Sequence, residues 1–379
     1  MPAPERRGIG NNMSGKHRVR FGIVGCGAIG PTHAGALKQL TDAELLAVAD
    51  VIPARAREMA GKFGVSRVYK SDVELIADPD IDAVIFATPS GMHADQAIRA
   101  MRAGKHAVVE KPMDISLDAC RRLIEAEQQT GKRLAIISQH RFDHATRVVR
   151  DVVLSGKLGR LIIADMSVKW WRTQQYYDSG DWRGTWAMDG GGALMNQGVH
   201  TVDLLTWLAG PVKRVNAVMR TAAGHERIEV EDAIVATLEF ENGAIGTLTA
   251  TTAAYPGMLA RLDLYGTEGA AVIEGDRIKL LKTKDGQIDV AEKASVHALS
   301  VAMGGTASVK DETAKRLADA AAADPGAVWG DAHREQLRDF IDAIRQNRPP
   351  LIHGEEGLRP VQVILAIYES ARRGQWVEV

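Results

Sequence analysis

The sequence predicts an α/β Rossmann domain with a parallel sheet, followed by an α+β domain with a large, mostly antiparallel sheet. Two observations predict this division. Up to about residue 141, short apolar runs alternate with helical segments, which is the pattern of βαβ units. Beyond it, runs rich in β-branched residues follow one another across turns such as Asn242-Gly243, which is typical of antiparallel strands. We therefore expect domains over 18–141 and 142–379.

The first domain is expected to contain five buried strands with helices between them. The strands are apolar runs bounded by turn residues: Arg18–Gly25, Glu44–Asp50, Ala83–Ala87, His106–Glu110 and Arg133–Ile137. The helices have apolar residues at helical spacing, and several end at a glycine or begin at a proline. They are Thr32–Leu40, Pro53–Phe63, Ser71–Ala77, Met92–Ala103 and Leu117–Thr130.

The second domain is expected to be a meander of strands around one helix, Ala193–Leu208. The strands are Leu161–Lys169, Arg214–Arg220, Asp232–Glu239, Ala244–Thr251, Leu259–Tyr265 and Ala270–Glu274. Two terminal helices, His333–Gln346 and Glu356–Arg373, flank a Pro-Pro break. The intervening stretch Lys282–Val328 is rich in Ala, Asp and Lys, and we assign no function to it.

Composition and charge exclude several classes of protein. The formal net charge of -1 provides no bulk basic field for nucleic acid or an anionic membrane. No apolar run reaches the roughly 18 residues of a membrane helix. Residues 1–17 lack the apolar core of a signal peptide, so we expect a disordered leader and a cytoplasmic protein. The two cysteines, Cys26 and Cys120, lack a metal-ligand spacing, and no metal site is expected.

A glycine-rich turn follows the first strand and opens the first helix. The run Gly25-Cys26-Gly27-Ala28-Ile29-Gly30 fits the pattern G-x-G-x-x-G. In such a turn Gly25 permits the sharp bend, Gly27 lets the backbone approach a pyrophosphate, and Gly30 lets the helix pack on the strand. The helix N-terminus then offers free N–H groups to the phosphates. This predicts a nicotinamide dinucleotide site to which Ala28 and Ile29 also contribute.

Two further strand ends extend the predicted cofactor site. Asp50 ends the second strand, where a carboxylate accepts the adenosine ribose hydroxyls and repels a 2′-phosphate, which favours NAD over NADP. Thr88 and Pro89 end the third strand and His93 follows, at the edge that faces the ligand. The alternatives are that Asp50 caps the next turn and that Thr88 and Pro89 form a plain turn.

The run Glu110-Lys111-Pro112 follows the fourth strand and places Lys111 near the nicotinamide end of the site. A partly desolvated lysine beside cationic NAD+ should have its ammonium form disfavoured, so that it can hold the substrate hydroxyl or exchange its proton. The alternative is an exposed lysine paired with Glu110.

A glycine-led segment supplies a second set of candidate catalytic residues. Asn196 and His200 are four positions apart, so they share one face of a helix, and Asp203 is placed to orient the imidazole. A histidine that titrates near neutrality suits the proton that leaves an alcohol as hydride departs. The alternative is a buried core histidine.

Tryptophan and arginine are concentrated just upstream of this segment. Five of the seven tryptophans fall between Trp170 and Trp207. This predicts a pocket in which aromatic rings stack on the substrate and arginines hold polar or anionic groups. The candidate residues are Trp171, Arg172, Tyr177, Trp182 and Arg183, with Asn196 and His200. The alternative is a subunit interface.

With these motifs, the chain resembles the Gfo/Idh/MocA family of sugar and cyclitol oxidoreductases from Arg18 to Val379. The resemblance implies catalysis by Lys111 and His200, and a homodimer or homotetramer built through the large sheet. Many family members have Asp where this chain has Asn196. The run from Tyr176 to Gln197 looks like the UDP-N-acetylglucosaminuronate 3-dehydrogenases, whereas 138–142 departs from them. A simpler glycoside or sugar acid is therefore equally open as substrate.

We therefore expect an NAD(P)-dependent dehydrogenase that oxidises a secondary hydroxyl of a sugar, sugar acid, glycoside or cyclitol, with the sugar C3 as one candidate carbon. Lys111, His200 and Asn196 are the expected catalytic residues. Cofactor contacts are expected from the glycine turn and Asp50, and from Thr88, Pro89, His93, Glu110 and Lys111. Two alternatives are an NAD-dependent glycosidase with transient oxidation and a catalytically silent NAD-binding protein.

Overall fold

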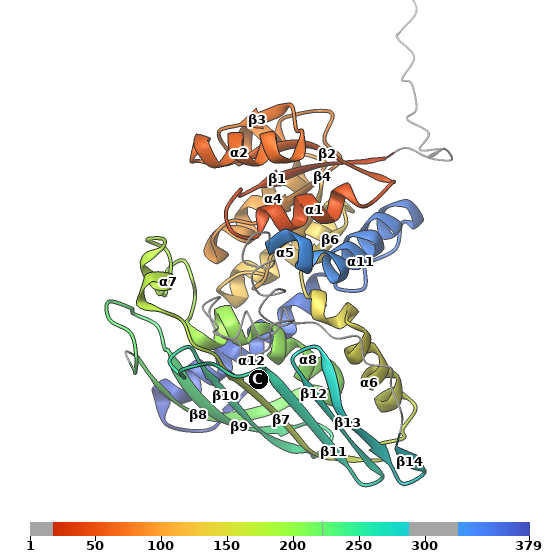
Figure 1. Cartoon of the computed structure of the whole chain (residues 1–379), viewed down its shortest axis with the longest axis vertical. Coiled ribbons are helices and arrows are strands. Elements are labelled where there is room, and N and C mark those ends of the chain that lie inside the picture. The colour runs from red at the N-terminus through yellow and green to blue at the C-terminus, as the bar shows by residue number, and fades with distance from the viewer. Residues whose placement is uncertain (1–17, 222, 288–324) are drawn as a thin grey trace, which may run out of the picture.

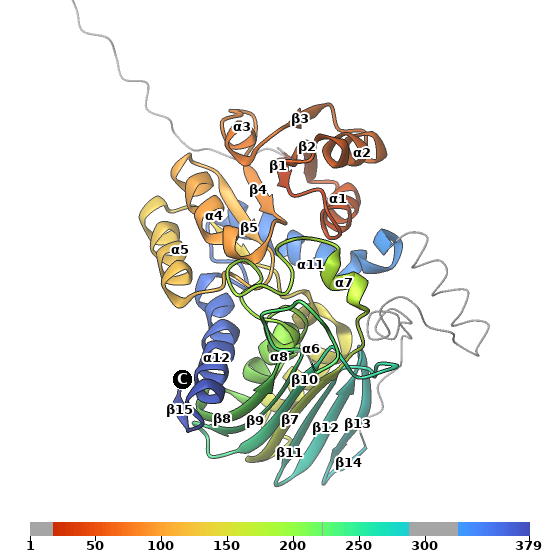
Figure 2. The same ribbon diagram turned by 90° about the vertical axis from the view of Figure 1, so that its left-hand side faces the viewer.

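The computed structural model describes residues 18–221, 223–287 and 325–379, and for 287 and 325–330 it describes the backbone alone. The expected leader over 1–17 and most of Lys282–Val328 lie outside these residues. Two sheets are stacked along the long axis of the molecule, with helices around the first and on one face of the second (Figures 1 and 2). This confirms the predicted fold class.

The first sheet has six parallel strands in the order β3-β2-β1-β4-β5-β6. The strand order reverses between β1 and β4, and such a switch point opens a crevice at the carboxyl ends of the strands. The strands are β1 (Val19–Val24), β2 (Ala43–Ala49), β3 (Arg67–Tyr69), β4 (Ala83–Phe86), β5 (His106–Val109) and β6 (Leu134–Ile136). The sequence pattern did not predict β3, because a three-residue edge strand is too short to show a periodicity.

The helices of the first domain cover both faces of this sheet. They are α1 (Gly30–Lys38), α2 (Pro53–Phe63), α3 (Asp72–Ile76), α4 (His93–Arg102) and α5 (Leu117–Thr130). Side-chain caps fix two of their starts, since Ser71 and Ser116 accept backbone hydrogen bonds at α3 and α5. All five agree with the predicted segments to within two residues at each end.

The second sheet has nine strands among the described residues, in the order β14-β13-β12-β11-β7-β10-β9-β8-β15. Neighbours are antiparallel except for β7 and β10, which are parallel. The six expected strands are β7 (Leu161–Lys169), β8 (Val212–Arg220), β9 (Ala233–Phe240), β10 (Ile245–Thr251), β11 (Arg261–Gly266) and β12 (Gly269–Glu274). The other three are β13 (Arg277–Thr283), β14 (Gly286–Gln287) and β15 (Val377–Glu378). Lysines obscure the apolar pattern of β13, and the other two contain only two residues each.

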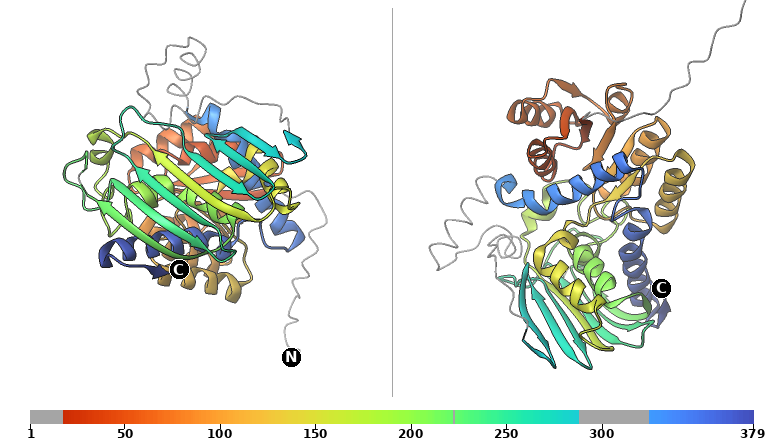
Figure 3. Two further views of the ribbon diagram at one scale, coloured as in Figure 1. Left: turned by 90° about the horizontal axis from the view of Figure 1, so that it is seen from below. Right: turned by 90° about the vertical axis from the view of Figure 1, so that its right-hand side faces the viewer.

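One face of this sheet is packed against helices and the other is bare (Figure 3, left). The covering helices include α6 (His144–Leu154), α8 (Val199–Ala209) and α12 (Gly354–Arg373), and the short α7 (Gln174–Asp178) lies at the rim (Figure 2). The expected helix from Ala193 begins as a π-helix, Ala193–Gly198, before α8 continues it. None of the helices in the described part of the chain has the length and apolar character of a membrane span.

The C-terminal segment returns to the first domain. Helix α11 (Pro325–Gln346) lies beside α1 (Figure 1), and its residues Leu337, Phe340 and Ile341 are buried in the same apolar cluster as Phe21. The rings of Phe21 and Phe340 are 6.3 Å apart. Although the sequence analysis assigned this helix to 142–379, it completes the helical layer of the first domain.

Candidate active site

A cleft of about 1920 Å³ opens where the carboxyl ends of the first sheet face the second domain. Its walls come from the glycine turn, the ends of β2, β4 and β5, the segment around α7 and the start of α8. Most of the predicted site residues line it: Gly25, Gly27, Ala28, Ile29, Asp50, Thr88, Pro89, Glu110, Lys111, Arg172, Trp182, Arg183, Asn196 and His200. The sheet topology therefore brings the two predicted sets of residues into one cleft.

The glycine turn has room for a ligand where a dinucleotide requires it. At Gly25, φ is +98° and a Cβ would collide with the carbonyl of Ala87. At Gly30 a Cβ would collide with the carbonyl of Gly25, so Gly30 serves the packing of α1 and does not line the cleft. A Cβ added at Gly27, in contrast, would have no protein atom within 4 Å beyond its own chain neighbours. The turn therefore fits a pyrophosphate at Gly27.

The Asp50 carboxylate lies between the glycine turn and the following turn. Its Oδ2 accepts the backbone N–H of Cys26 at 2.8 Å and its Oδ1 that of Ile52 at 2.7 Å. The capping role that the sequence analysis held as an alternative is thus present. Each oxygen keeps a further lone pair, and Asp50 lines the cleft, so a contact with a ribose hydroxyl is compatible with this arrangement.

His93 lies beneath the cleft rather than in its wall. Its side chain is 1% exposed, and its Nδ1 and Nε2 lie 2.8 Å and 2.9 Å from the backbone carbonyl oxygens of Pro112 and Thr88. Thr88 is also held through its hydroxyl, which donates to Gln96 at 2.6 Å. His93 therefore ties together the two loops that carry Thr88 and Lys111, and it does not reach the cofactor cleft.

Lys111 is held in the cleft by a bond across the two domains. Its Nζ donates to the backbone carbonyl oxygen of Asn196 at 2.9 Å. Burial lowers the pKa of this lysine, and the nearby carboxylates of Glu110 and Asp189 oppose that shift. An ammonium group with reduced proton affinity therefore faces the cleft.

The π-helical turn that carries Asn196 is anchored by a buried glutamate. The Glu231 carboxylate accepts the N–H groups of Gly192 and Leu194 at 2.9 and 2.8 Å, and the Tyr368 hydroxyl at 2.8 Å. A Cβ at Gly192 would collide with the backbone carbonyl of Glu231. The glycine run before Asn196 is therefore required for this close approach.

His200 lines the cleft together with Lys111 and lies beside His140. Burial and the positive charge of Lys111 hold its pKa well below the usual value, with smaller effects from His140 and His333. The rings of His140 and His200 meet edge to face with centroids 5.0 Å apart. His200 is therefore a neutral imidazole at neutral pH, which can accept a proton.

The expected role of Asp203 in orienting His200 is wrong. Its two carboxylate oxygens accept bidentate hydrogen bonds of 2.8 and 2.6 Å from the guanidinium of Arg141. Arg141 also donates to Glu356 at 2.6 Å. Asp203 and Arg141 are both buried, so this ion pair joins α8 to the segment after β6 and stabilises the fold behind the cleft.

One wall of the cleft consists of stacked arginine and aromatic side chains. Arg183 lies 4.5 Å from the ring centroids of both Tyr176 and Trp182. Arg172 lies 5.0 Å from the ring centroid of Trp170 and donates to the Gln197 Oε1 at 2.9 Å. Cation–π contacts and hydrogen bonds thus fix both guanidinium groups.

Two of the predicted substrate residues do not reach this wall. Tyr177 is buried and its hydroxyl bonds to Thr252 at 2.8 Å, whereas the Trp171 ring packs edge to face against Tyr255. Adjacent residues take their places in the cleft, namely Trp170 and Tyr176. Periodicity across an irregular loop does not show which of two consecutive aromatic residues faces inward.

Several cleft residues were missed by the sequence analysis. Gln197 donates to the Tyr176 hydroxyl at 2.8 Å and to Asn196 Oδ1 at 3.0 Å, and Asn196 donates to Asp189 at 2.5 Å. Gln139, His140, Cys26 and His333 also line the cleft. A signal existed for Gln197, a polar residue in an apolar helix, but none for His333, which is distant in sequence.

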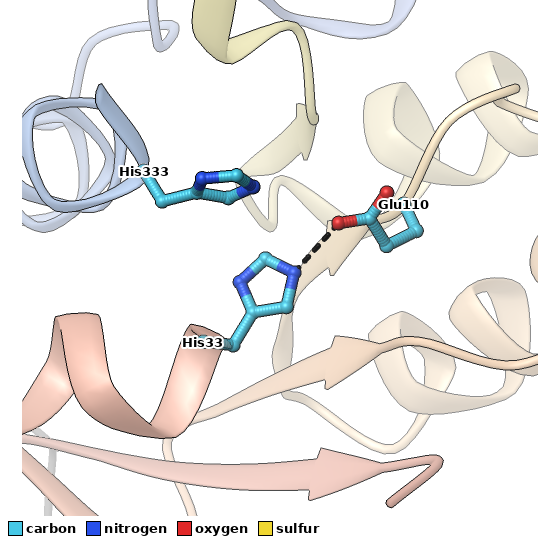
Figure 4. A group of neighbouring side chains, drawn as sticks. All are labelled: His33, Glu110 and His333. Carbon is cyan, nitrogen blue, oxygen red and sulfur yellow. Dashed lines mark hydrogen bonds and ion pairs between the residues drawn. The ribbon is translucent and has the colours of Figure 1, made fainter. Parts of the chain in front are cut away.

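A buried cluster lies behind Lys111, formed by His33, Glu110 and His333 (Figure 4). One potential ligand atom from each lies within 4.8 Å of the others, a spacing that a metal ion could occupy. Two of these atoms, His33 Nε2 and Glu110 Oε1, are already 2.7 Å apart in a hydrogen bond. The absence of a metal site therefore stays a prediction.

The fold and the cleft define a two-domain oxidoreductase with an NAD-binding Rossmann domain. Family models match both parts of the chain: "Oxidoreductase family, NAD-binding Rossmann fold" over 19–138 and "GFO/IDH/MocA C-terminal domain" over 146–272. The chain belongs to the Gfo/Idh/MocA family, as the sequence motifs predicted. It is an oxidoreductase acting on CH–OH groups.

The chain is similar to several characterised members along almost its whole length. The WlbA dehydrogenase from Bordetella pertussis, solved with NADH and UDP-GlcNAcA, is 33% identical with a TM-score of 0.79, covering 96% of this chain and 99% of that one. The scyllo-inositol 2-dehydrogenase (NAD(+)) of Bacillus subtilis is 28% identical over 96% of this chain and 97% of its own length. The myo-inositol 2-dehydrogenase of Thermotoga maritima is 26% identical over 89% of this chain and 92% of its own length.

Proposed function

We propose that the protein is an NAD-dependent dehydrogenase that oxidises a secondary hydroxyl of a carbohydrate, with a sugar acid or a nucleotide-linked sugar acid as the favoured substrate class. The observation that carries the proposal is that Lys111 and His200 line the same cleft as the glycine turn. When bound, the nicotinamide supplies the hydride acceptor.

The protein's own residues account for the proton and the position of the substrate. His200, neutral at physiological pH, accepts the hydroxyl proton as the C–H bond breaks. The Lys111 ammonium donates a hydrogen bond to the same oxygen and stabilises the negative charge that develops there. Asn196 is engaged through its backbone by Lys111 and through its amide by Asp189, so it positions Lys111 rather than transferring a proton.

The arginine wall favours an acidic substrate. Arg172 and Arg183 lie on the same side of the cleft, and each lowers the proton affinity of Lys111 electrostatically. A carboxylate between them would receive charge-assisted hydrogen bonds, and Trp182 would flank the sugar ring. Tyr176, Trp182, Arg183 and Gln197 of this wall belong to the run from Tyr176 to Gln197, which looks like the UDP-N-acetylglucosaminuronate 3-dehydrogenases.

Asp50 supports NAD rather than NADP as the cofactor. Its carboxylate lies at the end of β2 and lines the cleft, where it would repel a 2′-phosphate. Arg55 also lines this part of the cleft and would weaken the discrimination without reversing it. The ratio of kcat/KM with the two cofactors measures this preference, and a higher value with NADP would contradict it.

The bare face of the second sheet supports a homodimer or homotetramer. It carries exposed apolar side chains on neighbouring strands, among them Val218 on β8, Val235 on β9 and Ile245 on β10. An apolar patch of this kind usually marks an interface. Light scattering of the purified protein tests this, and Val235→Lys should reduce the mass if the face is the interface.

The activity is tested by following NAD+ reduction over a panel of sugars, inositols, uronates and UDP-sugars. We expect net NADH formation with an acidic sugar. Release of an aglycone from glycosides without net NADH would indicate the glycosidase alternative. NADH binding without turnover on any substrate of the panel would indicate a catalytically silent protein and contradict the proposal.

A further inference from the structure

The buried cluster behind Lys111 joins three distant parts of the chain. His33 comes from α1, Glu110 from the end of β5 and His333 from α11 (Figure 4). Their exposed fractions are 0%, 5% and 1%. No step of the proposed reaction uses the two histidines, so their burial beside a carboxylate requires another explanation.

The donor and the acceptor of each hydrogen bond within the cluster can be assigned. His33 Nε2 lies 2.7 Å from Glu110 Oε1, and because a carboxylate only accepts, Nε2 carries the hydrogen. The Nδ1 of His33 has no hydrogen-bond partner among the described residues, which agrees with this tautomer. Glu110 Oε2 accepts the backbone N–H of Lys111 at 3.1 Å. The carboxylate is therefore held by His33 on one side and holds Lys111 on the other.

Helix α11 contacts the His33 ring through His333 and so restrains the hydrogen bond between His33 and Glu110. The His333 ring meets the His33 ring edge to face, with centroids 5.3 Å apart and planes at 84° (Figure 4). Because α11 packs along α1, the position of the His33 ring depends on a helix more than 290 residues away in the sequence.

We propose that His33 is a positioning residue for the dehydrogenase reaction: it holds the Glu110 carboxylate, which in turn holds Lys111, and His333 keeps the His33 ring in place. The proposal rests on the proposed function, since it assumes that Lys111 acts on the substrate oxygen. It makes α11 part of the active-site structure, although this helix contributes no group that reacts.

The electrostatics of the cluster explain why a hydrogen-bond donor is needed. Burial raises the pKa of Glu110, but the hydrogen bond from His33, together with electrostatic contributions from the His33, His333 and Lys111 side chains, lowers it to about 2. These three side chains come from α1, from α11 and from the position next to Glu110. Without the His33 donor the pKa of Glu110 rises. A protonated Glu110 no longer supports the Lys111 ammonium, so the pKa of Lys111 falls further.

The test compares His33→Leu, which removes the donor, with His33→Gln, whose amide can still donate. In His33→Leu we expect kcat to fall about ten- to hundredfold, the effect of losing one hydrogen bond to a charged group, with little change in KM. Because the pKa of Lys111 falls, the alkaline limb of its pH profile should move to lower pH. His33→Gln should recover part of both effects. The control is His106→Leu at the other end of β5, where the ring only accepts the Arg133 N–H at 2.9 Å.

A second measurement does not depend on turnover. The pH dependence of Lys111 acylation, followed by mass spectrometry, reports the pKa of this lysine in each variant. We expect acylation at lower pH in His33→Leu than in the wild type, with His106→Leu unchanged. If the wild type has no activity but this shift appears, the proposed function fails and the linkage through Glu110 stands.

Three results would overturn the inference. The first is that His33→Leu has the same pH profile and the same Lys111 acylation curve as the wild type. The second is an equal loss in His33→Leu, His33→Gln and His106→Leu that follows their thermal stability. The third is a stoichiometric metal ion in the wild type that is absent from His33→Leu, which would make the cluster a metal site.

Discussion

The Lys111 ammonium donates a 2.9 Å hydrogen bond to the backbone carbonyl oxygen of Asn196, and this bond crosses from one domain to the other. Lys111 comes from the end of a parallel strand, whereas Asn196 comes from a π-helical turn fixed by the buried Glu231. The candidate catalytic groups therefore meet only when the two domains are packed together. We expect activity to depend on this packing as well as on the residues around the bond.

The pH dependence of kcat/KM should follow the lowered proton affinities of His200 and Lys111. Because the pKa of His200 lies well below 6.5, the base stays neutral, and activity should persist below pH 6.5 before it falls. On the alkaline side, activity should decrease as the Lys111 ammonium loses its proton. Because the pKa of Lys111 is lowered, this decrease should begin at a pH lower than 10.5. A profile whose acid limb lies above pH 6.5 would contradict the assignment of His200.

Gly27→Ala should weaken NADH binding at least about tenfold without affecting the free energy of unfolding. The reason is that no protein atom lies near the added methyl group, which instead enters the space for the pyrophosphate. NADH fluorescence titration and chemical denaturation measure the two effects. The matched control is Gly61→Ala on α2, which also has open space around it and should bind NADH normally.

Arg183→Leu should raise KM for an acidic sugar by about ten- to hundredfold, the effect of losing one charge-assisted contact. The effect on neutral sugars should be much smaller, because they lack the carboxylate that Arg183 would contact. Steady-state kinetics with a uronate and the corresponding neutral sugar provide the comparison, and Arg122→Leu on the far helix α5 is the control. Equal effects on both sugars would exclude recognition of the carboxylate.

Asp203→Ala should lower the free energy of unfolding by about 3–5 kcal/mol, because it leaves Arg141 buried with only one of its two carboxylate partners. The loss is measured by denaturant unfolding. If Asp203 oriented His200 instead, Asp203→Asn would change the pH profile of kcat with little loss of stability. We expect stability to change and the acid limb of that profile to stay in place.

Much of the fold could be predicted because it depends on local patterns. Glycine and proline residues located the helices of the first domain to within a few residues. The G-x-G-x-x-G pattern likewise indicated the turn after β1, which lies at the switch point of the sheet. The strand β13 was missed because lysines interrupt its apolar pattern. The return of α11 to the first domain depends on packing between Phe340 and Phe21, which no local signal contains.

Candidate site residues could be selected from the sequence where a polar residue stands out in its setting and has a characteristic chemical role. Lys111, Asn196 and His200 line the cleft, and each could be selected as a candidate because it is an unusual polar residue in its setting. Partners were not predictable in the same way. Asp203 is three positions from His200 but bonds to Arg141, and His93 lies next to the cofactor strand but holds two backbone carbonyls. Their partners are selected by the tertiary structure.

The most direct test of the account is to measure NADH affinity and NAD+ reduction in Lys111→Ala and in the wild type, with the best substrate of the panel. The account predicts an NADH dissociation constant within a few-fold of the wild type and a kcat lower by about a hundredfold or more, because the substrate oxygen loses its charged partner. Full turnover by Lys111→Ala with intact cofactor binding would contradict the central role of this lysine.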